Sequence, residues 1–331
     1  MSLNFPPPCA VWRKSVKKRI SALIFAMVLL LAGCAAKPEE SASRTVFAMD
    51  TIMNLTVYAS DPAPALDAAV REIYRLDAML ARGTEGSEVY RYNHGGAREG
   101  ELDELLTLAE NIRDSSGGAF DPYLGALLDL WGFGSGAGEH RVPSDEELAD
   151  VSALLDLGGI AKGYAGQRVL EVLKKNGVSR AVVDLGGDVA LLGKKPDGSD
   201  WHVAIRDPGE GNYLGILSTS GSKYIATSGV YERFFEENGI RYHHILDPRT
   251  GRPAESGLVS ATVICESGVW ADALATAVCV LGVEDSLALR DSLADTVKFD
   301  IIIVTEDGRA IYTCDGLEPD ESSGYAFERA S

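Results

Sequence analysis

Apolar positions along this chain recur with two different periods, one typical of strands and one typical of helices. Apolar and polar residues alternate around Met53, Leu55 and Val57, which predicts a strand. Spacings of three and four residues predict two helices, one through Leu66, Ala69, Val70, Ile73, Leu76 and Leu80 and one through Leu102, Leu105, Leu106, Ala109 and Ile112. Further strands are predicted at 181–183, 201–205, 258–265 and 301–304, the last paired with 310–312 in a hairpin. Because helices and strands mix without a regular βαβ rhythm, the pattern predicts an α+β fold with mixed or antiparallel sheets and packed helices.

Another predicted helix begins after a Gly-Gly pair and a lysine. The segment Asp156–Lys162 (DLGGIAK) leads into it, and the helix ends at Gly177. Free backbone N–H groups, the helix dipole and the Lys162 ammonium together suit a phosphate group. A second Asp-Leu-Gly-Gly occurs at Asp184–Gly187. The repetition marks either two similar corners that face one cleft or only a common type of turn.

The predicted helix Trp270–Leu281 carries an acidic and a hydroxyl side chain on one face. Asp272 and Thr276 are four residues apart, so they lie above one another. Their oxygens are the hard ligands that Mg²⁺ prefers. The alternative is structural, because the helix dipole favours an early Asp and a Thr hydroxyl bonds the backbone.

Two loops also carry candidate residues. Ser116–Gly134 alternates glycines with aromatics around Asp121, so its rings either clasp a planar ligand or fill the edge of the core. His243–Pro253 (HHILDPRTGRP) places His243, His244 and Asp247 on a turn stiffened by two prolines. An imidazole beside a carboxylate suits acid–base catalysis near neutral pH, although a histidine in a turn is often structural.

The first 33 residues have the pattern of an export signal. A basic stretch precedes the apolar run Ile20–Leu31, which is shorter than the ~20 residues that span a bilayer, and Leu-Ala-Gly-Cys follows. We interpret residues 1–33 as a lipoprotein signal peptide, with an uncleaved signal anchor as the alternative. Cys34 would then carry lipid, residues 34–44 form a tether, and 45–331 fold as one domain or as two intertwined subdomains. The protein would be extracytoplasmic and held at the membrane through Cys34.

The chain is acidic, with a formal net charge of −18, or −23 once the five basic residues of 1–33 are removed. Such a surface argues against nucleic acid as a partner and is compatible with a cation-dependent site. The cysteines after Cys34 are Cys265, Cys279 and Cys314, and no Cys/His cluster indicates zinc. We expect these three to be core residues.

Nine motifs, in order, resemble the FAD:protein FMN transferase (ApbE) family from about Thr45 to Tyr312. They are Met49-Asp50-Thr51, Ser87-Glu88 with Asn93, Gly118–Pro122, Leu130–Gly134, Leu155–Ala165, Leu185–Asp188, Ala226–Gly229, His243–Gly251 and Ala271–Ala277. The resemblance implies the fold of that family, with FAD in a central cleft. It also implies Mg²⁺-dependent transfer of FMN from FAD to a threonine of an exported flavoprotein, with release of AMP. The alternatives are a Mg²⁺-dependent FAD pyrophosphatase and a non-catalytic flavin-binding lipoprotein.

By resemblance, Asp272, Thr276 and the carbonyl of Ala161 would hold Mg²⁺. His244 would contact FAD and take the proton of the acceptor threonine, with Asp247 in support and Lys162 close to the phosphates or the ribityl chain. The remaining predicted FAD contacts are Met49, Gly118, Ala119, Phe120, Asp121, Asp184, Gly187, Thr227 and Ser228.

The sequence departs from the family pattern at two informative positions. Asp50 stands where members commonly carry Gly. Gly83 stands about where many members place a large side chain beside the flavin ring, and Tyr90 or Tyr92 are the candidates to replace it.

Overall fold

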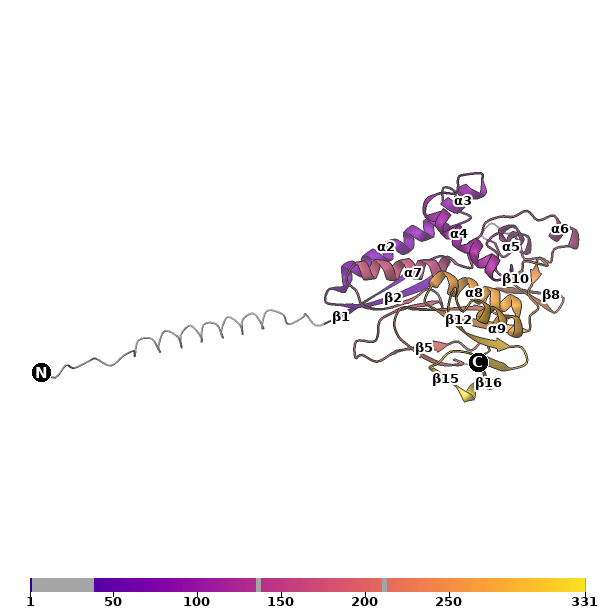
Figure 1. Ribbon diagram of the computed structural model, residues 1–331. Helices are drawn as coiled ribbons and strands as arrows, with labels where there is room; N and C mark the ends of the chain where they lie inside the picture. The colour runs from indigo at the N-terminus through magenta and orange to yellow at the C-terminus, as the bar shows by residue number, and fades with distance from the viewer. Residues whose placement is uncertain (2–38, 135–137, 210–212, 331) are drawn as a thin grey trace. The chain divides into compact units, whose positions relative to one another are not determined.

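The computed structural model describes residues 1, 39–134, 138–209 and 213–330, and its main compact unit begins at Glu40 (Figure 1). The helices of this unit are α2 (Pro62–Leu80), α3 (Glu88–Asn93), α4 (Gly100–Ser115), α5 (Gly125–Trp131), α6 (Asp145–Ala149), α7 (Ala161–Lys175), α8 (Gly268–Leu281), α9 (Val283–Ser292) and the 3-10 helix η1 (Glu321–Ser323). The strands are β1 (Glu40–Ala48), β2 (Thr51–Ala59), β3 (Arg180–Asp184), β4 (Val189–Leu192), β5 (Trp201–Ile205), β6 (Gly215–Thr219), β7 (Lys223–Gly229), β8 (Phe234–Glu237), β9 (Ile240–His243), β10 (Leu246–Asp247), β11 (Arg252–Pro253), β12 (Leu258–Cys265), β13 (Phe299–Thr305), β14 (Arg309–Tyr312), β15 (Leu317–Pro319) and β16 (Ala326–Arg329).

Nine strands form one central sheet in the order β1-β2-β3-β4-β7-β12-β13-β14-β16. Its neighbouring strands are antiparallel except for the parallel pair β14 and β16. The other strands form three small antiparallel sheets, β15-β6-β5, β8-β9 and β10-β11. The predicted α+β class is therefore confirmed.

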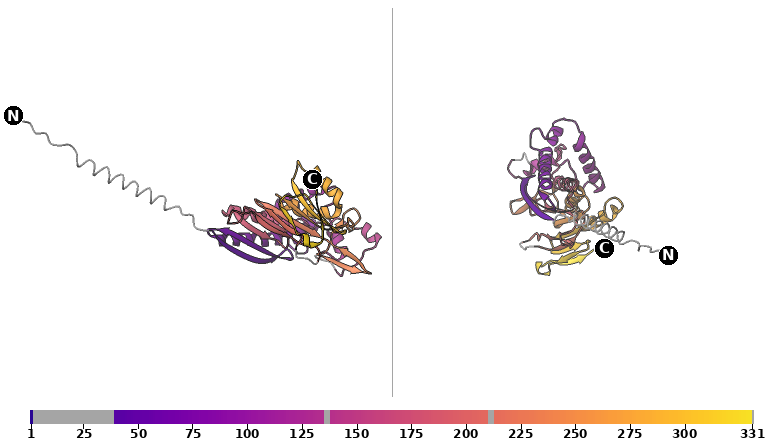
Figure 2. Two further views of the ribbon diagram at one scale, coloured as in Figure 1. Left: turned by 90° about the horizontal axis from the view of Figure 1, so that it is seen from below. Right: turned by 90° about the vertical axis from the view of Figure 1, so that its left-hand side faces the viewer.

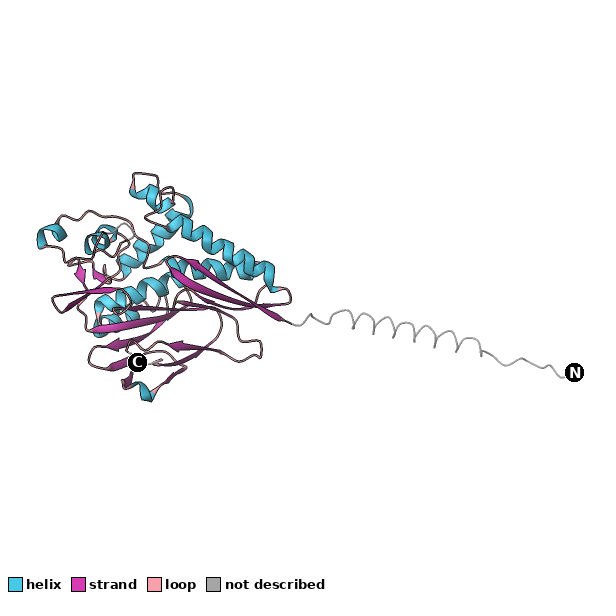
Figure 3. Ribbon diagram, turned by 180° about the vertical axis from the view of Figure 1, so that it is seen from behind, coloured by secondary structure: helices cyan, strands magenta, loops and turns pink. Residues whose placement is uncertain are grey.

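The central sheet is covered on both faces. Helices α2, α7 and α8 lie on one face and the β15-β6-β5 sheet lies on the other (Figures 1 and 3). Strand β13 shows the reason in its sequence, because Ile301 and Ile303 pack toward the helices whereas Ile302 and Val304 pack toward the small sheet. A strand buried on both faces needs a continuous apolar run rather than alternation.

The edge hairpin of β1 and β2 begins earlier than the sequence predicted (Figure 2). Residues 40–44 of the predicted tether belong to β1 and pair with β2. Their polar composition is typical of a linker, but it also suits an edge strand with an exposed side. The turn of the hairpin, Met49-Asp50, has φ values of 49° and 57°. Such values favour glycine, which is the residue that the family pattern predicts at position 50.

Helices α7 and α8 cross very closely. A Cβ atom on Gly163 would lie 2.0 Å from the carbonyl oxygen of Gly268, and a Cβ on Gly268 would lie 2.1 Å from that of Gly163. The absence of side chains at these two positions lets the backbones touch. The crossing brings the first turn of α7 against the side chains of α8.

Most predicted elements are confirmed, and β5 and β12 have the predicted bounds. The prediction that Ser116–Gly134 is a loop is corrected, because this segment contains helix α5. Its aromatic rings fill the core, with Trp131 fully buried and Phe120 and Phe133 nearly so. Cys265, Cys279 and Cys314 are buried free thiols, as expected. Within the described ranges, no helix has the length and apolar character needed to cross a membrane.

We expect Gly163→Ala to destabilise the fold by about 1–3 kcal/mol, because the new methyl group must push α7 and α8 apart. Urea unfolding of the purified protein measures this loss. Gly138→Ala is the matched control, since a Cβ there meets no atom within 4 Å; its effect should stay within about 0.5 kcal/mol. Equal stability of the two variants would show that the crossing can relax without cost.

Candidate functional site

The two Asp-Leu-Gly-Gly corners meet through the residues that follow them. Lys162 lies after the first corner, and its Nζ is 2.5 Å from Oδ2 of Asp188, which directly follows the second. Oδ1 of Asp188 accepts a hydrogen bond from the backbone N–H of Thr227 in β7 (3.0 Å). The repeated motif therefore marks two corners that face each other, rather than only a common turn.

Each corner is held by its own aspartate. Asp156 accepts a hydrogen bond from the N–H of Gly158 (2.8 Å), and its other carboxylate oxygen binds Nε of Arg82 (2.8 Å). Asp184 accepts from the N–H of Gly187 (2.9 Å). Short aspartate side chains commonly fix turns in this way. Asp184 and Gly187, which are predicted to contact FAD, are thus bonded to each other within the second corner.

Asp272 lies on α8 at the crossing with α7. Its Oδ2 accepts a hydrogen bond from the N–H of Gly163 (2.8 Å), and its Oδ1 lies 3.6 Å from Nζ of Lys162. Asp272 and Asp188 are only 3% and 4% exposed. Burial raises the pKa of Asp272 to about 6, and Asp188 adds to this effect while Lys162 opposes it. Burial would lower the pKa of Lys162, but Asp188 and Asp272 overcome it and raise the pKa.

Thr276 lies one turn further along the same face of α8. Its Oγ1 is 3.3 Å from the hydroxyl of Ser228, and Oγ1 of the neighbouring Thr227 is 2.8 Å from that of Thr262. The predicted FAD contacts Thr227 and Ser228 therefore adjoin both the Asp188 corner and α8. Ala161, the third predicted metal ligand, is the first residue of α7 and precedes Lys162.

The chemistry of these donors fits a magnesium ion. A carboxylate, a hydroxyl and a backbone carbonyl are hard oxygen ligands, and substrate phosphates can complete such a site. Two buried carboxylates face a single ammonium in this cluster, so additional positive charge would be stabilising. Among the described residues, no three His, Cys, Asp and Glu side chains group as a metal site, so the predicted set of Asp272, Thr276 and the carbonyl of Ala161 remains a prediction.

His244 follows β9 and is fixed by a backbone carbonyl. Its Nδ1 is 3.2 Å from the carbonyl oxygen of Arg233, which also accepts the backbone N–H of His244 (3.0 Å). Because a carbonyl only accepts, Nδ1 must carry the proton, and Nε2 then holds the lone pair. Burial, followed by the charge of Arg233, lowers the pKa of His244 to about 4. Its imidazole is therefore a neutral base at pH 7.

The two neighbours of His244 in the predicted catalytic turn have other partners. His243 is buried, with Nε2 3.1 Å from the carbonyl of Ala254, which indicates a packing role. The carboxylate of Asp247 accepts hydrogen bonds from the backbone N–H (2.9 Å) and the guanidinium (2.8 Å) of Arg249. The hydrogen bond that orients the His244 ring thus comes from Arg233, and the predicted support from Asp247 is not formed as a direct contact between the described side chains.

The remaining predicted contacts lie on two sides of this cluster. The N–H of Met49 donates to Asp77 (2.9 Å), and Thr51 packs so tightly on Gly186 that a Cβ there would lie 2.1 Å from its hydroxyl. The Met49 turn therefore adjoins the second corner. On the other side, Phe120 of the Gly118–Asp121 segment packs 3.2 Å from the Cβ position of Gly159 in the first corner.

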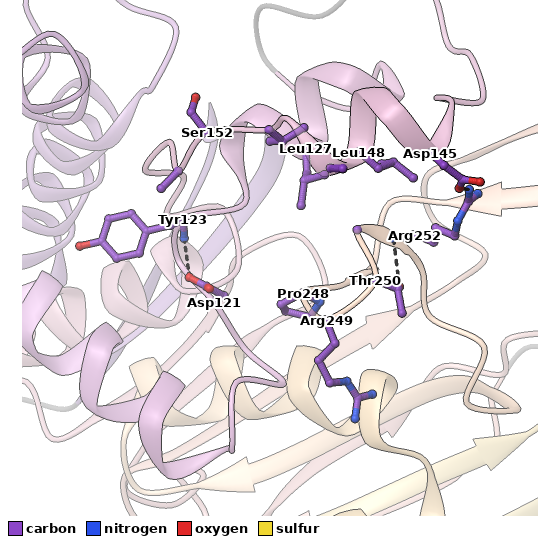
Figure 4. A pocket seen from close by; sticks show the side chains of 14 residues that line it. Asp121, Tyr123, Leu127, Asp145, Leu148, Ser152, Pro248, Arg249, Thr250 and Arg252 are labelled. Carbon is purple, nitrogen blue, oxygen red and sulfur yellow. Dashed lines mark hydrogen bonds and ion pairs between the residues drawn. The ribbon is translucent and has the colours of Figure 1, made fainter.

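A hollow of about 470 Å³ connects Asp121 with the turn after His244. Its lining includes Asp121, Tyr123, Leu127, Leu148 and the stretch 248–252 (Figure 4). Two of the recognised motifs thus share one cavity, although Lys162 and Asp272 do not line it. Ala119, two residues before Asp121, is buried.

The two tyrosines that are candidates to replace the missing side chain at Gly83 have partners in the protein. Gly83 is exposed, and Tyr90 stacks on His94 with ring centroids 4.0 Å apart. Tyr92 is partly buried against the main core. Neither contact assigns a flavin-stacking residue.

Sequence reasoning missed Asp188 and Arg233. Asp188 was part of a recognised motif, and an acidic residue after a Gly-Gly corner was the available signal. Arg233 acts through its backbone carbonyl, for which the side-chain pattern gives no signal.

Comparison with known proteins gives one consistent result. The model of the ApbE family matches residues 49–299. A Vibrio cholerae protein named FAD:protein FMN transferase is 33% identical over 326 residues, covering 89% of this chain and 96% of its own. One from Treponema pallidum is 32% identical, covering 85% and 88%. The crystal structure of the ApbE protein of Thermotoga maritima matches with a TM-score of 0.75 at 30% identity, and the match covers 86% of this chain and 98% of that one. The structure of the flavin transferase ApbE from Vibrio cholerae matches with a TM-score of 0.71 at 27% identity, and the match covers 85% of this chain and 96% of that one.

We expect the imidazole of His244 to titrate near pH 4, well below its ordinary pKa of 6.5. Its contribution to the free energy of unfolding is then fully present above pH 6.5 and is lost as the pH falls toward 4. NMR of the imidazole protons follows the titration, with the signal identified by its loss in His244→Gln. The control His202→Gln removes an exposed imidazole bonded to Ser218. A His244 signal that titrates at pH 6 or above would contradict a lowered pKa for this partly buried imidazole.

Proposed function

Since the chain belongs to the ApbE family, we propose that it is a transferase that moves FMN from FAD to a hydroxyl group of a partner protein. The observation that carries the proposal is the pairing of two different groups in one neighbourhood. A carboxylate and ammonium cluster at the α7–α8 crossing suits a pyrophosphate with its metal, and His244 supplies a neutral base. The Lys162 charge is among those that lower the pKa of His244, which supports their proximity.

The chemistry that we propose is an in-line displacement at phosphorus. The hydroxyl oxygen of an acceptor threonine bonds to the FMN-side phosphorus of FAD, the bridging P–O bond breaks, and AMP leaves with the bond's electron pair. Nε2 of His244 takes the hydroxyl proton. The carbonyl of Arg233 keeps this nitrogen unprotonated and the ring oriented. His244 therefore acts as the base without a direct carboxylate partner.

Asp272, Thr276 and the carbonyl of Ala161 would hold Mg²⁺, which when bound neutralises charge on the pyrophosphate. Lys162 would contribute a further positive charge close to the phosphates, from the end of α7 where the helix dipole also favours an anion. The two corners, with Thr227 and Ser228, would line the FAD cleft. We place the flavin and adenosine no more finely than this.

We also propose that the enzyme acts outside the cytoplasm, held to the membrane by lipid on Cys34, and that exported flavoproteins are its acceptors. Cys34 lies outside the described residues. The support is the sequence pattern of basic residues, apolar run and Leu-Ala-Gly-Cys. The acidic composition, which argues against nucleic acid as a partner, is compatible with this location.

We expect the purified protein, given FAD, Mg²⁺ and an exported flavoprotein with an accessible threonine, to add the mass of FMN minus water to that acceptor. Asp272→Asn keeps an acceptor for the Gly163 N–H but removes the charge, so the rate of modification should fall by at least ~10². The control Asp291→Asn alters an exposed carboxylate on α9 and should retain full activity.

Mass spectrometry and nucleotide chromatography of the same reaction separate the alternatives. Release of FMN and AMP at equal rates with and without acceptor would identify a pyrophosphatase, in which water replaces threonine. FAD that binds and stays intact would identify a binding protein. Unchanged transfer by Asp272→Asn would reject the metal role of this residue.

We expect His244→Gln to lower the transfer rate by ~10²–10⁴ while FAD remains bound, because a base acts on the proton and not on the cofactor. Quenching of flavin fluorescence measures binding, and acceptor mass measures transfer. His202→Gln serves as the matched control. A transfer rate in His244→Gln equal to that of the control would assign the base elsewhere.

A further inference from the structure

The carboxylate of Asp188 has no assigned role in the reaction, yet it lies at the centre of the charged cluster. It is 4% exposed and both of its oxygens are engaged, one by the Thr227 N–H and the other by Lys162. Asp188 belongs to a different corner from Lys162 and to a different layer from Asp272. Its position is therefore set by the fold and not by these two partners.

Lys162 has two buried carboxylates within reach and is shared unequally between them. Its Nζ is 2.5 Å from Asp188, which is a close charge-assisted contact, but 3.6 Å from Oδ1 of Asp272, which is beyond the usual 2.7–2.9 Å. The other oxygen of Asp272 already accepts the N–H of Gly163. Oδ1 of Asp272 is thus the oxygen that remains for a further cation.

The inference rests on the metal site of the proposed function. We propose that Asp188 is a positioning residue that holds the Lys162 ammonium away from Asp272 and so reserves Asp272 for a divalent cation. Without the charge of Asp188, the strongest nearby attraction for Lys162 is Asp272, and a partly buried ammonium without a close partner is costly. Lys162 would then move onto Oδ1 and compete with the metal for it.

Other charged groups near Lys162 do not replace Asp188 in this role. Glu232 is close enough to influence Lys162, but it is exposed to solvent, where its attraction is screened. Desolvation raises the pKa of Glu232, and Arg206 attracts this carboxylate as Lys162 does. Of Asp188 and Glu232, only Asp188 is buried and bonded to a backbone N–H among the described contacts.

A double-mutant cycle on the full chain tests this competition, with Mn²⁺ as the probe and the EPR signal of free Mn²⁺ as the readout. Asp188→Asn retains an oxygen for the Thr227 N–H and should weaken Mn²⁺ binding by about tenfold or more. Lys162→Met should bind Mn²⁺ at least as tightly as the wild type. In the Lys162→Met background, Asp188→Asn should cost no more than about threefold, because the competitor is gone.

Equal losses from Asp188→Asn in both backgrounds would overturn the proposal, since a simple contribution of negative charge is additive. Loss of binding in Lys162→Met would also overturn it, and this arm does not depend on how Asp188→Asn folds. Thermal unfolding of each variant identifies a general loss of structure. If the wild type binds no Mn²⁺, the proposed metal site fails together with this inference; if it binds and the cycle is additive, only the inference fails.

Discussion

The ion pair between Lys162 and Asp188 is the contact on which the arrangement of the candidate site depends. It joins the first turn of α7 to the corner between β3 and β4, while Asp188 also binds the backbone of β7. Burying ions costs several kcal/mol each unless partners compensate, so these elements have little freedom to separate. The pair thus fixes the position of Asp188, which lies in a loop, close to the Asp272 carboxylate of α8.

The crossing of α7 and α8 is the steric counterpart of this electrostatic constraint. Gly163 serves both, because its missing side chain admits Gly268 and its N–H binds Asp272. A larger residue would separate the helices and remove the donor from the carboxylate at the same time. The charged cluster is consequently assembled from secondary structure. His244 instead follows the β8-β9 hairpin, which packs on Trp131 through Phe235 and Tyr242.

Local pattern was sufficient for much of the fold. The apolar runs of β12 and β13 predicted their bounds closely, because burial on both faces leaves a continuous signal. Contacts between distant segments were not predictable. Asp188 is 26 residues from Lys162, and the Trp131 indole donates to the carbonyl of Gly251, 120 residues away. The support that we predicted from Asp247 stays a prediction, because its carboxylate binds the guanidinium of Arg249, two residues away.

The buried thiols of Cys265, Cys279 and Cys314 have a consequence for where the domain can fold. Each is a free, core-packed side chain, so the described part of the chain is held by packing, hydrogen bonds and ion pairs without an oxidised cross-link. Its stability is therefore independent of the redox state of the compartment. The described residues can therefore fold in a reducing or in an oxidising compartment, since no disulfide among them has to form.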